Sequence, residues 1–432
     1  MQVVVLGGGS SGEHFVGALR RLDEHAEIKL VERRLVGGEC SYWACMPTKT
    51  MLRGPELVAE SRRAPGVEPA RLDVAGTFHW RDLVAERDDS GQVAWLAERD
   101  CEVVRGNAAV VRPGLVRVGE RELPYDRLVI ATGSSPAIPQ VPGIEGTGYW
   151  TNIQATETLE VPESLLVLGG GPVGCELAQF FARAGSKVTV LESSERLLPG
   201  IDAEAGGLVE AGLSEDGVAI RTGTKTESFE PKAAVLAGSE HIGFSQLLVA
   251  VGRRPNVDGL DALGLTVRKS GIEVDERLRA AENVWAIGDV NGIALLTHVG
   301  KYQARIAAYD IAGRETRADY RAIPATVFTD PQVATVGTLE GKIATWKLTA
   351  TPRLSTWERP KRPGFLKIAA DPERRILIGA VAVGPEAGEW LQQLTLAIRA
   401  ETPIDVLLDV IQPYPTFSEA VFLALRELAL DL

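Results

Sequence analysis

Two cysteines five residues apart, Cys40 and Cys45, are the residues whose type and spacing most directly suggest redox chemistry. They follow a Gly37-Gly38 turn and precede Pro47-Thr48-Lys49, where we expect a helix to begin. A thiolate at the start of a helix would be stabilised by the helix N-terminus, which lowers its pKa and makes it reactive. The alternative is a pair of structural cysteines, because free cysteine is usually a small buried apolar residue. The cysteines alone do not decide between the two.

The spacing also sets a geometric condition on any bond between the two sulfurs. A disulfide needs its Cα atoms about 4.4–6.8 Å apart, whereas five residues of ideal helix rise about 7.5 Å along the axis. If Cys40 and Cys45 pair, the helix must therefore be distorted at its start. We expect that helix to continue to about Ala59.

Composition limits the classes of partner. The 432 residues allow two to four domains, and the 45 % apolar and 24 % charged content is typical of a globular protein. The 46 lysines and arginines against 58 aspartates and glutamates give a net charge of −12, which argues against nucleic acid and anionic membranes as partners. No apolar run reaches the roughly 18 residues of a spanning helix, and no secretory signal is expected before the apolar residues 2–6. Four cysteines favour a reducing cytoplasm, where a disulfide would be catalytic.

Two glycine-rich turns carry the pattern Gly-x-Gly-x-x-Gly directly after an apolar strand. The first has Gly7, Gly9, Ser11 and Gly12, and the second has Gly169, Gly171 and Gly174. Such glycines permit a tight turn and a close approach of the backbone to a pyrophosphate at a helix N-terminus. Each next strand ends in a glutamate, Glu32 or Glu192, where a ribose hydroxyl is expected. A glycine-rich loop that binds nothing is the alternative for one turn, but two complete patterns predict two dinucleotides.

The second turn also predicts which nicotinamide nucleotide binds. Glu192 suits the 2′-hydroxyl of NAD and would repel a 2′-phosphate. Arg196 lies close enough in sequence to keep NADP open. NAD(H) is therefore favoured, and NADP(H) remains possible.

The cysteine segment resembles the redox centre of the FAD-dependent pyridine nucleotide–disulfide oxidoreductases, which include dihydrolipoamide dehydrogenase, glutathione reductase and mercuric reductase. Their pattern is Gly-Gly-x-Cys-x-Asn-x-Gly-Cys-x-Pro-Ser/Thr-Lys. Tyr42 replaces the Asn and Ala44 replaces the Gly before the second cysteine, whereas the cysteine spacing and the Pro-Thr-Lys match. The resemblance implies a redox disulfide in which Cys45 faces the flavin and Cys40 exchanges with substrate.

The same resemblance assigns the other site residues. It implies that Lys49 pairs with Glu176 beside flavin N5, where a cation stabilises the reduced flavin. Further positions that it assigns to cofactor binding are Ala131, Thr132 and Gly133 in an Ala-Thr-Gly turn, Asp289 at a ribitol hydroxyl, Leu296 and Thr297 along the isoalloxazine, and Gly252 in the turn that closes the NAD domain.

The predicted fold class is α/β, with two Rossmann-like dinucleotide-binding domains and an α+β C-terminal dimerisation domain. We expect an FAD-binding domain at 1–145 and 275–322, an NAD(P)-binding domain at 146–274 and an interface domain at 323–432 that forms a homodimer. Residues 79–99 are predicted as one amphipathic helix, and 101–118 as short strands.

One motif departs from the family. Where its disulfide reductases carry His-Pro-Thr-x-x-Glu, with the His as acid–base, this chain has Tyr414 and Glu419 at the two ends of the motif. Tyr has a pKa of about 10 against about 6.5 for His, and positioned acid–base catalysis is worth roughly 10²–10⁴-fold. Efficient dihydrolipoamide or glutathione chemistry is thus less expected. Alternatively, Tyr414 merely packs at the dimer interface.

Mercuric reductases resemble this motif with Tyr at the same position. The sequence has neither their N-terminal metal-binding module nor their C-terminal cysteine pair, since it ends in Leu430-Asp431-Leu432. We predict no metal site.

The sequence therefore predicts an enzyme in which NAD(P)H reduces the flavin, the flavin reduces the disulfide, and Cys40 attacks a small oxidised acceptor. A quinone-type reductase fed directly by the flavin and a mercuric-reductase-like enzyme are alternatives. A flavoprotein that acts as a redox sensor or structural subunit, without turnover, is an alternative of another class.

Overall fold

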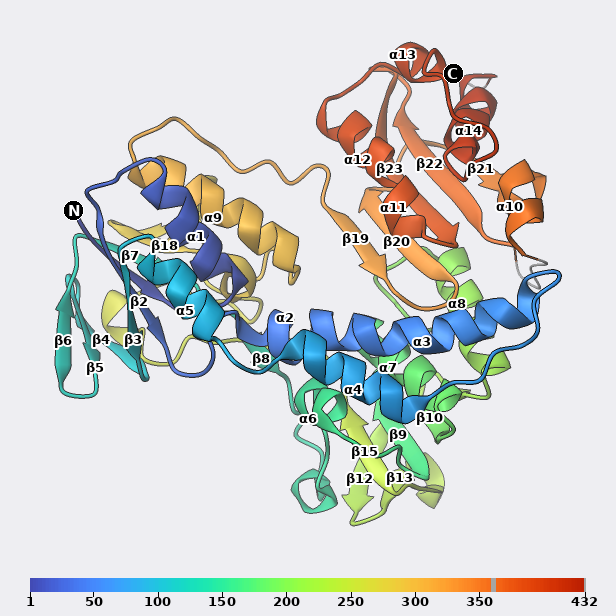
Figure 1. Cartoon of the computed structure of the whole chain (residues 1–432), viewed down its shortest axis with the longest axis horizontal. Helices are drawn as coiled ribbons and strands as arrows, with labels where there is room; N and C mark the ends of the chain where they lie inside the picture. Colours follow the sequence, from blue (N-terminus) through green and yellow to red (C-terminus); the bar gives the residue numbers. More distant parts are fainter. Residues whose placement is uncertain (359–362, 431–432) are drawn as a thin grey trace. The chain divides into compact units, whose positions relative to one another are not determined.

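In the computed structural model, residues 1–358 and 363–430 are described, and the terminal Asp431 and Leu432 lie outside this range (Figure 1). The chain forms two compact units. The first comprises Met1–Pro47, Asp82–Ala137 and Gly252–Asp319, and the second comprises Thr48–Arg81, Ile138–Val251 and Tyr320–Leu432. The predicted boundaries of three domains, at 145/146, 274/275 and 322/323, differ from the bounds of these two units, and the division into three domains stays a prediction.

The first unit is built on a six-stranded sheet in the order β17-β18-β7-β1-β2-β3, parallel except for β17. Its strands are β1 (Gln2–Leu6), β2 (Glu27–Glu32), β3 (Cys101–Arg105), β7 (Arg127–Ile130), β17 (Arg279–Ala281) and β18 (Val284–Ala286). Its helices are α1 (Ser10–Arg20), α2 (Gly38–Tyr42), α5 (Ser90–Ala97) and α9 (Thr297–Ile311). Smaller sheets pair β4 (Ala108–Arg112), β5 (Leu115–Val118) and β6 (Arg121–Pro124), and β8 (Ser134–Pro136) with β16 (Arg253–Pro255).

Alternate residues of β1 face opposite sides of this sheet, as the two-residue period of a strand requires. Val3 and Val5 pack against α1 and α9, which lie side by side in Figure 1. Val4 and Leu6 pack against the small sheet β4-β5-β6. From Val3 to Leu6 the strand is apolar because both of its faces are covered, as in other parallel sheets.

The second unit contains a four-stranded parallel sheet in the order β11-β10-β9-β15. Its strands are β9 (Ser164–Leu168), β10 (Lys187–Leu191), β11 (Ala219–Arg221) and β15 (Gln246–Val249), with a three-stranded sheet of β12 (Thr226–Glu230), β13 (Ala233–Leu236) and β14 (His241–Gly243). Its helices are α6 (Asn152–Glu157), α7 (Pro172–Arg183) and α8 (Ala203–Glu215). Leu165 and Val167 of β9 face α7 and α8, whereas Leu166 and Leu168 face the three-stranded sheet.

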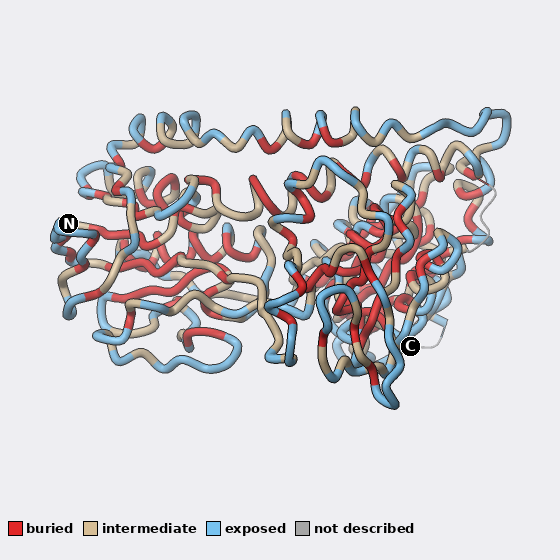
Figure 2. Tube along the Cα trace, turned by 90° about the horizontal axis from the view of Figure 1, so that it is seen from below, coloured by how far each residue is buried: buried red, intermediate tan, exposed pale blue. Residues whose placement is uncertain are grey.

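The C-terminal part of the same unit is a five-stranded antiparallel sheet in the order β19-β20-β23-β22-β21. Its strands are β19 (Pro324–Val327), β20 (Gln332–Gly337), β21 (Lys342–Lys347), β22 (Phe365–Asp371) and β23 (Ile376–Gly384). Its helices are α10 (Pro352–Trp357), α11 (Ala387–Trp390), α12 (Gln392–Arg399), α13 (Ile404–Leu408) and α14 (Glu419–Leu430). Buried residues follow the strands (Figure 2), and the predicted α/β class with an α+β C-terminal part is confirmed.

Two helix predictions need correction. The segment 79–99 is not one helix: α4 (Val74–Ala85) ends before Glu86, whose φ is +43°, and α5 begins again at Ser90. The helix after the cysteines, α3 (Cys45–Arg63), is longer than the predicted end at Ala59. Short 3-10 turns complete the description: η1 (Ile144–Thr147), η2 (Ala237–Ser239), η3 (Asp261–Leu263), η4 (Gly288–Asn291) and η5 (Leu348–Ala350).

Candidate active site

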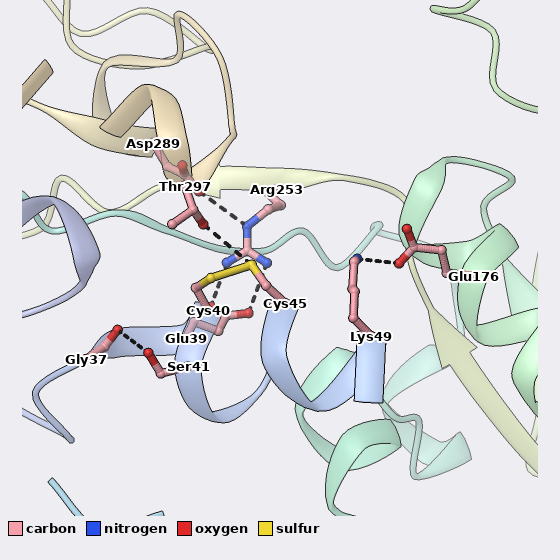
Figure 3. Close-up of a disulfide and its surroundings, with 10 residues drawn as sticks. All are labelled: Gly37, Glu39, Cys40, Ser41, Cys45, Lys49, Glu176, Arg253, Asp289 and Thr297. Atoms are coloured by element: carbon pink, nitrogen blue, oxygen red, sulfur yellow. Dashed lines mark hydrogen bonds and ion pairs between the residues drawn. A yellow bond between two sulfur atoms is a disulfide. The ribbon is translucent and has the colours of Figure 1, made fainter. Parts of the chain in front are cut away.

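The two cysteines of the Gly37–Lys49 segment form a disulfide, drawn in Figure 3. Cys40 lies in α2, whereas Cys45 begins α3, and their Cα atoms are 4.7 Å apart. Between them the chain leaves helical geometry at Trp43, with φ −139° and ψ 0°. This break brings the two Cα atoms closer than a continuous helix would allow, so the pairing and the helix distortion are confirmed.

Neighbouring side chains fix the segment that carries the disulfide. Tyr42, which replaces the Asn of the family pattern, is buried and donates its hydroxyl to the carbonyl of Val36 at 2.6 Å. Burial and the nearby Asp89 carboxylate raise the pKa of Tyr42 to about 12, so this phenol is neutral and structural. On the other side, Thr297 Oγ1 lies 3.5 Å from Cys45 Sγ.

Sequence reasoning missed an ion pair directly beside the disulfide. Arg253 donates from Nη1 to Glu39 Oε1 at 3.0 Å and from Nη2 to Oε2 at 2.6 Å (Figure 3). Glu39 immediately precedes Cys40, but Arg253 lies 214 residues away in sequence. The only sequence signal was a charged residue next to each of two expected site positions, Cys40 and Gly252, which does not by itself pair them.

The remaining two cysteines are not redox groups. Cys101 and Cys175 are free and buried. Burial raises the pKa of each thiol to about 12, so neither forms an appreciable fraction of thiolate at neutral pH. Buried free cysteines of this kind pack as small apolar residues.

The first glycine-rich turn has no room for side chains at two of its glycines. A Cβ on Gly7 would lie 2.3 Å from the carbonyl oxygen of Ala131, and a Cβ on Gly12 would lie 2.0 Å from that of Gly7. Glu32, at the end of β2, accepts a hydrogen bond from the backbone N–H of Gly8 at 2.7 Å. The turn, the helix and the strand-end carboxylate are therefore placed together, as predicted from the sequence.

The Ala131-Thr132-Gly133 turn lies at the end of β7 and is tied to a second loop. Thr132 Oγ1 donates to the carbonyl of Asn256 at 2.6 Å, and Asn256 Nδ2 donates to the carbonyl of Thr132 at 2.9 Å. Ser134 follows and donates from Oγ to Asp289 Oδ2 at 2.6 Å. Burial raises the pKa of Asp289, so this carboxyl accepts or shares protons more readily than an exposed one.

The second glycine-rich turn repeats the geometry of the first. A Cβ on Gly169 would lie 2.4 Å from the carbonyl oxygen of Ala250, and a Cβ on Gly174 would lie 2.0 Å from that of Gly169. Glu192 accepts from the N–H groups of Gly170 and Ser194, each at 2.7 Å. Burial opposes ionisation of Glu192, but these hydrogen bonds outweigh it and hold its pKa below the ordinary value.

Arg196 is held away from the role that would favour NADP. Its two terminal nitrogens donate to the backbone carbonyls of Leu198, Pro199 and Ile201 at 2.7–2.9 Å. The guanidinium therefore closes the loop after β10. A free cation for a 2′-phosphate is not supplied by this residue.

Lys49 and Glu176 form a close ion pair in the second unit. Lys49 Nζ lies 2.6 Å from Glu176 Oε2, and the Glu176 side chain is only 3 % exposed. The other carboxylate oxygen accepts the backbone N–H of Phe328 at 2.9 Å, and the Phe328 ring lies 4.9 Å from Lys49 Nζ. Lys49 also follows Cys45 by four residues in α3, so the two lie on one face of that helix.

Tyr414 and Glu419 do not hydrogen-bond to each other. Tyr414 is 72 % exposed and has no hydrogen-bond partner among residues 1–358 and 363–430. Glu419 begins α14, and its Oε2 is buried without a partner in the same part of the chain.

The residues present fit two dinucleotides. Each turn brings together a helix N-terminus, a close backbone approach and a carboxylate at the end of the next strand, an arrangement suited to a dinucleotide. At Gly133, Gly171 and Gly252 an added Cβ would meet nothing within 4 Å, so the backbone there borders open space. In the described residues we find no cluster of His, Cys, Asp or Glu suited to a metal ion, and no helix long and apolar enough to cross a membrane.

Comparison with known proteins gives a consistent result. Residues 1–314 match the family model of the pyridine nucleotide-disulphide oxidoreductases, and residues 323–425 match the dimerisation domain of these proteins. The chain is 33 % identical to dihydrolipoyl dehydrogenase 2 of Haloarcula marismortui, covering 97 % of this chain and 95 % of that protein. It is 31 % identical to a mercuric reductase of Staphylococcus aureus, covering 96 % and 80 % respectively.

Solved structures agree with this. The HOCl-induced flavoprotein disulfide reductase RclA of Escherichia coli superposes with a TM-score of 0.85 at 26 % identity, over 99 % of both chains.

Proposed function

The chain belongs to the pyridine nucleotide–disulfide oxidoreductase family, as an FAD-dependent enzyme with a redox-active Cys40–Cys45 disulfide, and we propose that it reduces a small oxidised acceptor at the expense of NADH. The single observation that carries the proposal is the disulfide at the junction of α2 and α3. FAD, when bound, would take up the nicotinamide hydride and supply two electrons to an adjacent disulfide.

The two cysteines divide the work. Cys45 begins α3 and lies beside Thr297, where the helix N-terminus stabilises a thiolate, so it takes the flavin side. Cys40 lies on the short helix α2 and is the thiol that attacks the acceptor. After reduction, the Cys40 thiolate attacks a disulfide acceptor, which breaks the acceptor S–S bond, forms a mixed disulfide with Cys40 and releases one acceptor thiolate. Cys45 then attacks Cys40, which restores the Cys40–Cys45 disulfide and releases the second acceptor thiolate.

Lys49 and Glu176 hold charge near the flavin nitrogen N5. Glu176 is nearly inaccessible and is bonded on both oxygens, so it fixes the ammonium group of Lys49 in place. A fixed cation stabilises negative charge that develops during reduction without reorganising. Phe328, which sequence reasoning did not single out, completes the hold by its N–H and its ring.

NADH is the proposed reductant. Glu192 is held at the end of β10 with a lowered pKa, so it stays ionised and would repel a 2′-phosphate. Arg196, which had kept NADP open, donates to backbone carbonyls instead. The same paired hydrogen bonds make Glu192 a good acceptor for a ribose 2′-hydroxyl.

We also propose a homodimer in a reducing cytoplasm. The dimerisation domain exposes large apolar side chains that a partner copy would cover: Leu396, Val406, Val410, Ile411, Tyr414 and Leu430. The buried free thiols of Cys101 and Cys175 suit a compartment that keeps cysteine reduced.

Tyr414 bears on which acceptor is reduced, because it stands where the family has its acid–base histidine. A phenol is a poor base at neutral pH, so ordinary small disulfides and dithiols are expected to be slow substrates. Direct electron transfer from the flavin to a quinone is the second candidate, because it requires no such base. Because Tyr414 is exposed in one chain, a second copy of the chain in the homodimer could cover it at the interface or at its active site.

The experiment compares kcat/KM for lipoamide, glutathione disulfide and a benzoquinone in the wild type and in Tyr414→His. If the missing base limits disulfide exchange, the variant gains disulfide activity by an appreciable part of the roughly 10²–10⁴-fold range of acid–base catalysis, and quinone reduction changes little. Glu419 lies five residues further on, so the variant restores the His and Glu of the family motif in sequence. Wild-type disulfide turnover that Tyr414→His does not increase would contradict the proposal.

A further inference from the structure

We propose that the Glu39–Arg253 ion pair sets the acidity of the Cys40 thiol in the reduced enzyme, and so the fraction of Cys40 present as reactive thiolate. The inference rests on the proposed function, in which Cys40 is the exchanging thiol. Neither residue was a predicted site residue. Both act on Cys40 through the local charge and are positioning residues, not catalytic ones.

The geometry of the pair is that of a strong, oriented salt bridge. Both carboxylate oxygens of Glu39 accept from Arg253, at 3.0 and 2.6 Å, and the side chains are 22 % and 21 % exposed. Such bidentate, half-buried pairs are better ordered and less screened than surface pairs. Glu39 directly precedes Cys40 in α2, and Arg253, bonded to Glu39, is drawn with it among the surroundings of the disulfide in Figure 3.

Arg253 does not depend on Glu39 for its place. Its Nε donates to Ser134 Oγ at 2.6 Å, its Nη2 also donates to the carbonyl of Ser134 at 2.8 Å, and Asp289 Oδ2 lies 3.9 Å from Nε. Removing the charge of Glu39 therefore leaves an anchored cation beside α2. Removing the charge of Arg253 leaves a carboxylate without its bidentate partner.

These two changes must move the Cys40 thiol in opposite directions. Without the Glu39 charge, Arg253 keeps Asp289 at 3.9 Å, but the local charge becomes more positive, which favours the thiolate and lowers its pKa. Without the Arg253 charge, the local charge becomes more negative, which disfavours the thiolate and raises its pKa. The elements around the disulfide carry other charged or titratable groups, among them Asp289 in η4, His298 in α9 and Lys49 in α3. These groups are the same in every variant, so they shift the pKa of the Cys40 thiol equally in all of them. The opposite directions expected for the two single variants therefore remain.

The test measures alkylation of the FAD-loaded enzyme after anaerobic reduction with one two-electron equivalent of dithionite. The thiolate sulfur attacks iodoacetamide, a C–S bond forms and iodide leaves, so the rate against pH reports the thiolate fraction. Peptide mapping identifies which cysteine is labelled. We expect the pKa to fall in Glu39→Gln and to rise in Arg253→Gln, each by about half a unit or more, which is a roughly threefold change in rate below the pKa.

Two kinds of control separate charge from packing. The double variant Glu39→Gln/Arg253→Gln removes both charges and is expected to return toward the wild-type pKa, and Arg253→Lys keeps the cation. Glu273→Gln and Arg268→Gln break an exposed Arg–Glu pair of the same unit, whose nearest nitrogen and oxygen are 3.0 Å apart, and should leave the pKa unchanged.

Shifts of the same sign in the two single variants, or no shift in either, would overturn the inference. If Arg253→Gln does not fold, the test uses Glu39→Gln and the double variant Glu39→Gln/Arg253→Lys. Both variants keep a cation at position 253 and lack the Glu39 charge, so the pKa of the Cys40 thiol must fall in both. Labelling of Cys45 in place of Cys40 in the wild type would instead contradict the proposed function, whatever the variants show.

Discussion

The two glycine-rich turns of this chain are almost the same in backbone and yet differ in what surrounds them. Gly7 and Gly169 have φ of +105° and +110°, and each lies against the carbonyl of an alanine at the end of a neighbouring strand. At the end of the next strand, Glu32 accepts the N–H of Gly8 and Glu192 accepts the N–H of Gly170, each at 2.7 Å. Shared geometry of this kind follows from the glycines themselves, because only they tolerate the close approach.

The neighbours of the two carboxylates differ. Glu32 is followed by the exposed Arg33 and Arg34 and is itself only partly buried. Each carboxylate accepts a second backbone N–H at 2.7 Å, Glu32 from Arg34 and Glu192 from Ser194. Glu192, however, is buried, and its nearby Arg196 donates to backbone carbonyls. The glycine pattern therefore predicts that a dinucleotide binds, and the residues around the strand-end carboxylate predict which one.

The largest expected effect is the loss of nucleotide binding when the third glycine of either turn is replaced by alanine, which adds a single methyl group. Gly12→Ala and Gly174→Ala each place a Cβ about 2 Å from a backbone carbonyl oxygen, where nothing flexible can move aside. We expect Gly12→Ala to abolish stable FAD binding, seen as loss of flavin absorbance on purification. Gly174→Ala should keep FAD but raise the Kd for NADH by about 100-fold or more, equivalent to about 2.7 kcal/mol.

Gly207→Ala in α8 is the matched control, because a Cβ there meets nothing within 4 Å, and it should change neither binding. Retention of FAD by Gly12→Ala, or loss of FAD in Gly174→Ala alone, would show that the assignment of the two turns is wrong.

A smaller effect is expected on the preference for NADH over NADPH, which we assign to the Glu192 carboxylate. Wild-type enzyme should be reduced at least about tenfold more efficiently by NADH than by NADPH, as a like-charge contact of roughly 1.4 kcal/mol implies. Glu192→Gln should narrow this ratio by improving NADPH. Arg196→Ala should leave it unchanged, because that guanidinium binds carbonyls. Stopped-flow reduction with each nucleotide is the measurement, and a preference for NADPH that Arg196→Ala removes would reverse our assignment.

The smallest effect concerns the residue after the third glycine, which is Glu13 in the first turn and Cys175 in the second. Burial, with Asp89 adding to it and Lys301 opposing it, raises the pKa of Glu13 to about 7 from its ordinary 4.5. The folded chain therefore favours the protonated carboxyl, so the wild type loses stability as the pH rises from 4.5 through 7. Glu13→Gln lacks this loss.

The melting temperature gained by Glu13→Gln should thus be larger at pH 8 than at pH 5, by about 1–3 °C. The exposed Glu24→Gln serves as the control and should show no difference between the two pH values. An equal gain for Glu13→Gln at both pH values would mean that this carboxyl is ionised throughout.

Local patterns made much of this fold and site predictable. The strand–turn–helix order, both strand-end glutamates and the cysteine spacing are local, and the resemblance supplied the pairing of Lys49 with Glu176. The break at Glu86 was missed because the amphipathic pattern continues across it. The loop there is held by Asp89, whose carboxylate accepts from the N–H of Val36 and pairs with Arg105.

The ion pair of Glu39 with Arg253 was missed for a related reason. Its partners are 214 residues apart, and Arg253 lies in β16, which is placed by its pairing with β8. Contacts that depend on how distant strands are ordered leave no periodic signal in the sequence.

The central claim is that electrons leave through the Cys40–Cys45 dithiol, and Cys40→Ser tests it most directly. The measurement is steady-state kcat/KM for a small disulfide and for a benzoquinone, together with stopped-flow reduction of the bound flavin by NADH, in the wild type and the variant. We predict that Cys40→Ser is still reduced by NADH but loses at least about 10³-fold in disulfide turnover, because the nucleophile is gone. Disulfide turnover that survives in Cys40→Ser would contradict the claim.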